Sequence, residues 1–224
     1  MSFRPARLRL QSLGEILVTL GFLTDATSAP LLSPFTAFSN PLGSVRALAA
    51  FTLLSSLLML LLIALLSRLR GESLRGLCLG KGVSPRREIF LGLGLVPLVF
   101  LVSFLIKSFT RHALPGLYSG EQNVLEELMK SPLDLGLFLV VALVAGGFRE
   151  ELQRAFIIKR FEAGWGPAWL GATLFAICFG YGHLLQGKDE AIIAGVFGLL
   201  WGCIYVARRN IIATSLSHGL YDAL

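Results

Sequence analysis

Long apolar segments separated by clusters of basic residues constrain the fold of this chain more than any other feature of its sequence. The run 57–66 is entirely apolar and lies within an apolar segment over 46–67. A second apolar segment covers 89–108 and includes Pro97. Because about 20 apolar residues in a helix cross the hydrocarbon core of a bilayer, each segment is long enough to span a membrane.

The composition agrees with a membrane-embedded chain. Of the 224 residues, 54% are hydrophobic and only 15% are charged, whereas a soluble domain has about 25% charged residues. Backbone polar groups inside a bilayer must be bonded within the protein, which favours helices. We therefore predict an all-α, polytopic transmembrane bundle of about six to seven spans, in a single integral membrane domain over 1–224.

The same pattern assigns the other segments. Residues 10–24 are apolar but contain Glu15, so they form either a poor first span or an interfacial helix. Breaker residues predict loops over 25–44, 68–88 and 109–133 and a turn at 164–167. Apolar runs predict helices over 134–161, 168–186, 190–207 and 211–224.

The basic residues lie at the ends of the apolar segments. The net charge is +6 and the isoelectric point about 9.6, with Lys and Arg clusters at 1–9, 68–87, 159–160 and 208–209. If 10–24 crosses the membrane, all four fall on one side, which the positive-inside rule makes cytoplasmic. They predict topology signals and contacts with anionic membrane lipids, not a nucleic-acid site. We expect a multi-pass protein of the bacterial inner membrane without an N-terminal signal peptide.

Three cysteines are too widely spaced to build a site. Cys78, Cys178 and Cys203 contain no Cys-x-x-Cys pair, which excludes a disulfide framework and a zinc site made of thiolates. Cys178 and Cys203 lie in apolar segments, where we expect them to pack as small apolar residues.

Two adjacent carboxylates lie inside an apolar segment. Glu150 and Glu151 interrupt the segment 140–158, between Arg149 and Arg154. An ionised side chain at membrane depth costs at least about 2.5 kcal/mol, so such groups usually face a polar cavity and serve a function there. Glu150 and Arg154 are one helical turn apart, which predicts that they share a face. The alternative is a helix end at the interface, with all four charges in water.

Two later apolar segments each carry a histidine. Phe179 and His183 are four residues apart and share a helix face, and so do His218 and Asp222. An Asp that accepts a hydrogen bond from an imidazole fixes the tautomer of the ring. Alone, each histidine has an ordinary alternative, as a structural group or as part of a frayed, solvated helix end. Polar groups on three apolar segments together favour a shared site.

The three motifs together resemble the CPBP family of intramembrane proteases, which includes type II CAAX prenyl proteases and Abi-type bacteriocin-immunity proteins. That family is marked by Glu-Glu-x-x-x-Arg, then Phe-x-x-x-His, then His-x-x-x-Asn/Asp. The resemblance covers about 135–224, which we take as the motif-bearing catalytic core. In the same order, this chain has Glu150-Glu151-Leu-Gln-Arg154, Phe179-Gly-Tyr-Gly-His183 and His218-Gly-Leu-Tyr-Asp222.

The first motif is one residue shorter than the family pattern. The family has three residues between Glu-Glu and Arg, whereas this chain has two. Alignment on the glutamates makes Glu150 the first acid, and alignment on Arg154 makes it the second. Glu150 is therefore a motif position in either case, and the role of Glu151 stays open.

The resemblance implies hydrolysis of a peptide bond within the membrane. Glu150 and His183 would activate a water molecule, with Glu151 as the second candidate acid. His218 and Asp222 would stabilise the oxyanion of the tetrahedral intermediate.

The resemblance also implies the substrate class and the supporting residues. The substrate would be a membrane-embedded or lipid-anchored peptide or protein. Arg154 would orient the acid pair, and Phe179 of the second motif would be a further structural or orienting residue. A glutamate-based mechanism without metal or cofactor is favoured, and a zinc-dependent mechanism with the same residue types is the alternative.

The same residues allow functions without glutamate-based proteolysis. A family-like scaffold or immunity protein would bind a peptide or partner without cutting it, and a transporter would use a membrane carboxylate as a proton relay. A rhomboid-type serine protease is disfavoured, because Ser215 and Ser217 lack a Gly-x-Ser-x-Gly motif.

The expected depth of His183 in the membrane conflicts with a shared site. At 1.5 Å per residue, Glu150 lies about 14 Å from the basic edge at 159–160, and His218 lies about 14 Å from Arg209. His183 lies about 24 Å beyond Pro167, which is about 10 Å too deep. The three side chains meet only if the helix after Pro167 starts outside the membrane or tilts strongly.

Overall fold

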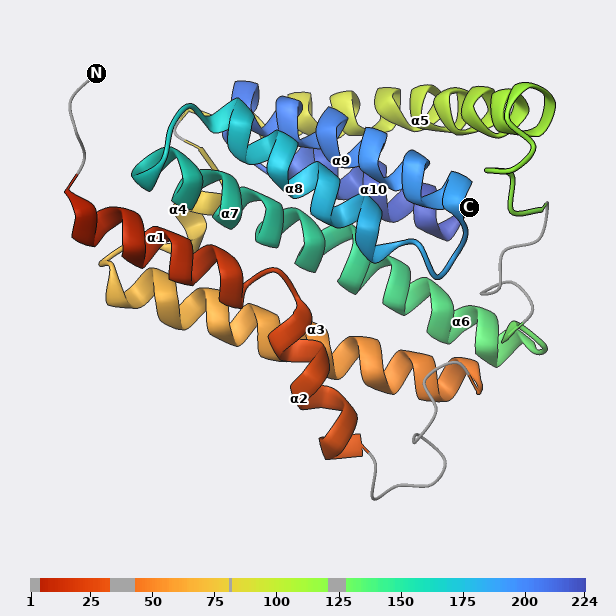
Figure 1. Cartoon of the computed structure of the whole chain (residues 1–224), viewed down its shortest axis with the longest axis horizontal. Helices are drawn as coiled ribbons and strands as arrows, with labels where there is room; N and C mark the ends of the chain where they lie inside the picture. The colour runs from red at the N-terminus through yellow and green to blue at the C-terminus, as the bar shows by residue number, and fades with distance from the viewer. Residues whose placement is uncertain (1–4, 33–42, 81, 121–127) are drawn as a thin grey trace.

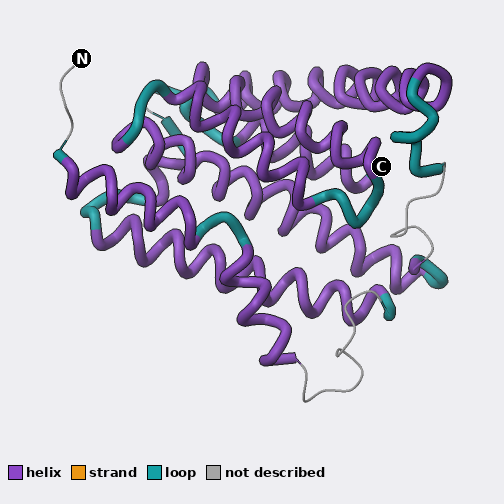
Figure 2. Tube along the Cα trace, viewed as in Figure 1, coloured by secondary structure: helices purple, strands orange, loops and turns teal. Residues whose placement is uncertain are grey.

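The protein is a bundle of helices, seen in a computed structural model that describes residues 5–32, 43–80, 82–120 and 128–224. Every regular element in these ranges is helical (Figures 1 and 2). In chain order they are α1 (Ala6–Val18), α2 (Phe22–Leu32), α3 (Val45–Leu69), α4 (Leu74–Cys78), α5 (Pro85–Ala113), α6 (Pro132–Val141), the π-helix η3 (Ala142–Glu150), α7 (Glu151–Gly164), α8 (Ala168–Gly182), α9 (Lys188–Arg208) and α10 (Ile212–Ala223).

One long helix runs through the middle of the bundle. It is formed by α6, η3 and α7 without interruption, over Pro132–Gly164. Its start is fixed by Ser131, whose hydroxyl accepts a hydrogen bond from the backbone N–H of Asp134, and by Pro132 in the first turn. The π-helix in its centre ends at Glu150, directly before α7.

The other helices pack around this central helix. Along α7, α1 lies against it and so does α8, which in turn packs on α9. Along η3, the neighbours are α3 and α10, and α10 is backed by α5. Figure 1 shows this order, with α5 and α3 at opposite edges of the bundle. The central helix therefore presents its middle to elements from both halves of the chain.

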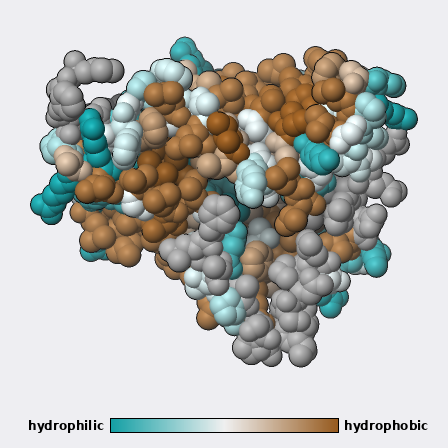
Figure 3. All heavy atoms as spheres, viewed as in Figure 1, coloured by the Kyte–Doolittle hydropathy of each residue, from teal (hydrophilic) through white to brown (hydrophobic). Residues whose placement is uncertain are grey.

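The predicted all-α membrane bundle is confirmed. Among the described residues, four helices are long and apolar enough to cross a membrane: α3, α5, α9 and the continuous helix α6–η3–α7. Apolar side chains cover much of the surface in Figure 3. Helix α8 is apolar but shorter, and α1, α2 and α10 are shorter still. The expected six to seven crossings therefore include helices that do not reach spanning length.

The N-terminal segment differs from the sequence-based boundaries. Residues 10–24 do not form one helix, because α1 ends at Val18 and α2 begins at Phe22. Gly21 has φ of 107°, a left-handed conformation that glycine adopts without steric cost, and the helix axis changes direction there. Helix α2 also occupies the first part of the expected loop 25–44, of which 33–42 lie outside the described residues.

Other boundaries differ by shorter lengths. The expected loop 68–88 contains α4 and the first turn of α5, which continues unbroken through Pro97 to Ala113. The predicted turn at 164–167 is present, because α7 ends at Gly164 and α8 begins at Ala168. Helix α8 stops at Gly182, earlier than expected.

Ion pairs join three segments at one end of the bundle. Arg160 of α7 is fully buried and pairs with Glu15 of α1 and with Glu72 after α3. Arg70 also pairs with Glu15 at 2.8 Å, and Lys159 pairs with Glu72 at 3.0 Å. The basic segments 68–87 and 159–160 therefore meet at this end through shared acids, although they were expected to lie free at the membrane surface. We call these five residues the end network.

Candidate active site

The acidic pair lies where the π-helix passes into α7. Arg149 pairs with Glu150, with 3.1 Å between Nη2 and Oε1. Arg154 pairs with Glu151, three residues before it, and not with Glu150, which was expected to share its helix face. The two acids therefore have separate arginine partners.

The surroundings of Arg154 explain its choice of partner. Its side chain is fully buried, and the guanidinium lies 4.9 Å from the ring centre of Phe175, 5.3 Å from that of Phe179 and 5.5 Å from that of Trp201. Aromatic faces attract a cation, and these three rings come from α8 and α9. They hold Arg154 on the side of the helix where Glu151 lies. Phe179, expected as a motif residue beside the acids, thus contacts the arginine that pairs with one of them.

His218 lies among three carboxylates. Its Nδ1 is 2.8 Å from Oε1 of Glu151, and its Nε2 is 3.7 Å from Oε2 of Glu150 and 3.5 Å from Oδ2 of Asp222. The ring stacks on Trp201 with centroids 4.0 Å apart. The group that accepts the hydrogen bond from Nδ1 and fixes the tautomer is therefore Glu151, and the predicted acceptor Asp222 faces the other nitrogen.

His183 is oriented by the backbone of its own helix. Its Nδ1 lies 2.8 Å from the carbonyl oxygen of Phe179. Because a carbonyl only accepts hydrogen bonds, Nδ1 carries the proton and Nε2 has a free lone pair. The rings of Phe179 and His183 also lie 4.5 Å apart, which fixes the plane of the imidazole.

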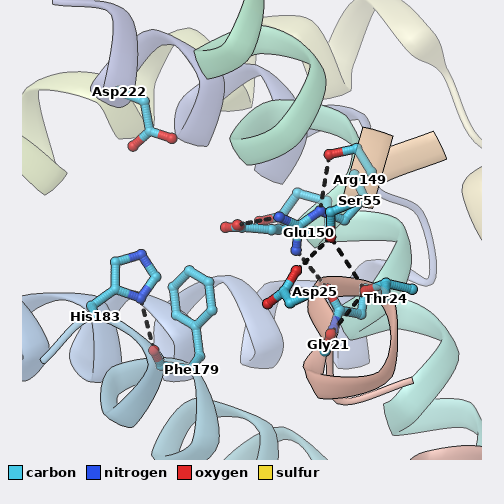
Figure 4. A network of polar contacts seen from close by, with 12 residues as sticks. Gly21, Thr24, Asp25, Ser55, Arg149, Glu150, Phe179, His183 and Asp222 are labelled. Atoms are coloured by element: carbon cyan, nitrogen blue, oxygen red, sulfur yellow. Dashed lines mark hydrogen bonds and ion pairs between the residues drawn. The ribbon is translucent and has the colours of Figure 1, made fainter. Parts of the chain in front are cut away.

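Glu150 and His183 line the same cavity. Its volume is about 250 Å³, and Phe175, Phe179 and Cys178 of α8 form one wall. In Figure 4 the carboxylate of Glu150 points toward the space between His183 and Asp222. The sequence-predicted residues therefore converge: Glu150, Glu151, His218 and Asp222 by direct contact, and His183 through the cavity that it shares with Glu150.

The opposite wall of the cavity comes from the N-terminal helices, where no site residue was predicted. Thr24, Asp25 and Ser55 line it, and the hydroxyl of Ser55 donates a hydrogen bond to Asp25 (Figure 4). Gln153 lines it from α7. The one signal in the sequence was the pair Ser55–Ser56, two hydroxyls in the middle of an otherwise apolar span.

The depth conflict at His183 is resolved by the true end of α7. Arg160 is buried in the end network, and α7 continues beyond it to Gly164. Counted from the turn between α7 and α8, Glu150 and His183 are about equally far away along antiparallel helices. The two depths disagreed because one was counted from the basic residues within α7 and the other from the turn that follows it.

The zinc alternative can be compared with the arrangement of donors. Protein zinc sites use three or four donors that converge within about 2.3 Å of the ion. Among the described ranges, no three His, Cys, Asp or Glu side chains are grouped to hold a metal ion. Nδ1 of each imidazole is bonded to Glu151 or to the Phe179 carbonyl, which leaves Nε2 as the nitrogen that a metal could reach.

Comparison with known proteins gives one match. Residues 132–224 match a family model described as type II CAAX prenyl endopeptidase Rce1-like. No curated protein and no solved structure matches the chain. The matched segment runs from the first residue of the central helix to the end of the chain and contains all the motif residues. The match confirms the resemblance drawn from the motifs: over 132–224, this integral membrane protein is similar to the Rce1-like type II CAAX prenyl endopeptidases.

Proposed function

We propose that the protein is an intramembrane endopeptidase that hydrolyses a peptide bond of a membrane-associated protein or peptide, with Glu150 as the base. The observation that carries the proposal is the cavity that Glu150 and His183 share, directly beside His218. The cavity brings a carboxylate oxygen and a free imidazole nitrogen to one space, as activation of water requires. The match to the endopeptidase family supports the same reaction class.

The first step uses the free atoms of the cavity. Oε1 of Glu150 is held by Arg149, which leaves Oε2 on the side of His218. A water molecule between Glu150 and Nε2 of His183 gives one proton to Glu150 as its oxygen bonds to the substrate carbonyl carbon. The carbonyl π electrons move to oxygen and form the oxyanion. Glu150 then passes this proton to the leaving amine as the C–N bond breaks, so one water is consumed and an acid and an amine are released.

His218 stabilises the oxyanion. Its Nδ1–H donates to Glu151, which fixes the plane of the ring, and its doubly protonated form donates from Nε2 to the developing negative charge. Trp201, stacked on the ring, keeps the imidazole from turning away. Asp222 lies 3.5 Å from Nε2 and limits the position of that N–H. Arg154 balances the charge of Glu151, so it orients one acid only.

The substrate class and the type of protease form part of the same proposal. A lipid-anchored peptide in the bacterial inner membrane matches a site between apolar helices and a family named for prenylated CAAX substrates. We favour a glutamate-based mechanism over a zinc mechanism, since Glu150 and His183 share a cavity in which they can activate water directly.

Cleavage of a defined peptide tests the proposal. The purified protein in phospholipid vesicles is mixed with a farnesylated CAAX peptide that carries a fluorophore and a quencher. A general base contributes about 10²- to 10⁴-fold to the rate, so Glu150→Gln should lose at least about a hundredfold in kcat. Equal rates for wild type and Glu150→Gln would exclude Glu150 as the base. Binding of the peptide without cleavage by the wild type would favour the non-catalytic scaffold.

A further inference from the structure

The break between α1 and α2 touches the helix that carries the acids. The backbone carbonyl of Thr19, the residue after α1, accepts a hydrogen bond from Nε2 of Gln153 at 2.7 Å. Thr19 is fully buried and Gln153 is 4% exposed. An α-helix leaves its last carbonyl groups without intrahelical donors, and this one lies close to the end of α1. The contact therefore joins a free helix end to the acid-bearing helix.

Gln153 continues this contact toward the site. Its Oε1 accepts a hydrogen bond from Nη1 of Arg149 at 2.9 Å, one turn earlier along the helix. Both polar atoms of the amide are therefore bonded, one to each neighbour. These two bonds fix the orientation of the amide. If its oxygen and nitrogen were exchanged, the NH2 group would face the N–H donor of Arg149 and the oxygen would face the carbonyl of Thr19.

Arg149 completes the path to Glu150. Its Nη2 pairs with Oε1 of Glu150 at 3.1 Å, and its Nε lies 3.4 Å from the hydroxyl of Ser56 in α3. All three nitrogens of the guanidinium thus have different partners, and the planar group is held in one orientation. Oε1 of Glu150 is held with it, while Oε2 stays free on the side of His218.

We propose that Arg149 and Gln153 are positioning residues, which hold Glu150 in its reactive orientation through the chain of contacts Thr19–Gln153–Arg149–Glu150. The inference rests on the proposed function, in which Glu150 is the base. Neither residue touches the reacting atoms. Both act through Glu150, whose carboxylate must lie within hydrogen-bond reach of the water.

Through this chain of contacts, the N-terminal helices help to position Glu150. Thr19 and Ser56 lie outside 132–224, the segment that matches the endopeptidase family. Arg149 occupies the first-acid position when the motif is aligned on Arg154. An arginine there removes one acid and supplies a guanidinium, which itself requires anchors. Gln153, Thr19 and Ser56 are those anchors.

Steady-state kinetics on the farnesylated CAAX peptide test the inference. Misplacement of a catalytic group by about 1 Å costs about a hundredfold in rate, so Arg149→Ala and Gln153→Ala should each lower kcat by about that factor with little change in KM. Arg149→Lys keeps the charge but cannot reach three partners, so it should recover only part of the loss. Added guanidinium ion should partly restore Arg149→Ala and have no effect on Glu150→Gln.

A further variant tests the connection to the N-terminal helices. Gln153→Glu can still accept from Arg149 but cannot donate to the Thr19 carbonyl. It should also lower kcat, because the anchor is lost and the new charge draws Arg149 away from Glu150. Two exposed residues serve as matched controls, Arg87→Ala at the start of α5 and Gln11→Ala on α1, and both should keep the wild-type rate. Gel filtration and thermal unfolding identify variants that have lost the fold.

The outcomes separate the two proposals. If wild type cleaves and Glu150→Gln does not, a wild-type rate for Arg149→Ala or Arg149→Lys overturns the positioning of Glu150. In the same case, a wild-type rate for Gln153→Glu overturns the role of the N-terminal helices. If wild type and Glu150→Gln cleave equally, or neither cleaves, the proposed function fails and the positioning inference fails with it.

Discussion

Each buried charge at the site has a specific partner, and the two acids differ in how they are paired. Glu151 is 1% exposed and bonded to the fully buried Arg154 and to His218. The side chain of Glu150 is 15% exposed, and that of its partner Arg149 is 17% exposed. Under the proposed mechanism, this difference predicts separate roles, with Glu151 mainly structural and Glu150 mainly chemical.

The two glutamates should therefore respond differently to neutralisation. Removal of one partner of a buried ion pair costs about 3 to 5 kcal/mol, because the other charge stays buried and unpaired. Glu151→Gln should lower the midpoint of thermal unfolding in detergent strongly, while Glu150→Gln should change it little and abolish cleavage. Equal unfolding midpoints for the two variants would contradict the separation.

Removal of metal ions tests whether the proposed protease is glutamate-based or zinc-dependent. Protein that has been treated with a strong chelator and freed of metal should cleave the peptide at the untreated rate. Elemental analysis of the same sample supplies the control. Loss of activity that returns only with added zinc would favour the metal-dependent alternative.

At the scale of elements, close packing of α10 on the π-helix brings His218 and Asp222 to the acids. Gly146, Gly147 and Gly219 permit this approach, since an added Cβ at Gly147 would lie 3.1 Å from the Cα of Gly219. At Gly146 an added Cβ would collide with the carboxylate of Asp222. The obstacle there is the end of a side chain and not a backbone.

Gly146→Ala should therefore move Asp222 without removing it. Alanine is favoured over glycine in a helix by about 0.5–1 kcal/mol, so the unfolding midpoint should stay the same or rise. The cleavage rate should fall to that of Asp222→Ala. Gly136→Ala on α6 is the matched control, because an added Cβ there meets open space. A wild-type rate for Gly146→Ala would show that the position of Asp222 is unimportant.

From the sequence we could predict which residues come together at the site. We could not predict equally well which of them form pairs. Spacing by four placed Phe179 with His183 and His218 with Asp222 correctly on common faces. Spacing did not decide which acid Arg154 holds, because i,i+3 and i,i+4 partners are both within reach on a helix, and the choice depended on rings from α8 and α9. The contribution of Asp25 and Thr19 depended on the fold of α1 and α2, which no motif described.

At the scale of the whole molecule, the end network ties the N-terminal helix and the segment after α3 to the central helix. Glu72 forms ion pairs with Arg160 and Lys159, both of α7. Burial acts to raise the pKa of Glu72, but the hydrogen bonds and charges of Arg160 and Lys159 outweigh it and hold the pKa below its ordinary value of 4.5. Glu72 thus stabilises the folded state in its ionised form.

This pairing predicts loss of stability in acid. The pKa of Glu72 is lower in the folded than in the unfolded state, so its contribution is complete above the ordinary pKa and disappears as the pH falls through the folded value. The unfolding midpoint should therefore fall below about pH 4.5, and Glu72→Gln should make that fall shallower. Glu162→Gln, which breaks an exposed pair with Arg209, should leave the profile unchanged. Identical profiles for Glu72→Gln and wild type would rule out this role.

The π-helix also determines how the central helix tolerates changes in length. A π-helix closes its hydrogen bonds at i→i+5 and so holds more residues per turn than an α-helix. Deletion of one residue within 142–150 can therefore be absorbed by a return to α-helical winding, with Glu150 still at the junction. Helix α6 then keeps nearly the same stripe of side chains toward the lipid, whereas the same deletion in an ordinary α-helix would turn α6 by about 100° about its axis. Among homologues, loss of a residue just before the acids should therefore be accompanied by loss of the π-helix, while the lipid-facing side of α6 and the motif residues stay the same.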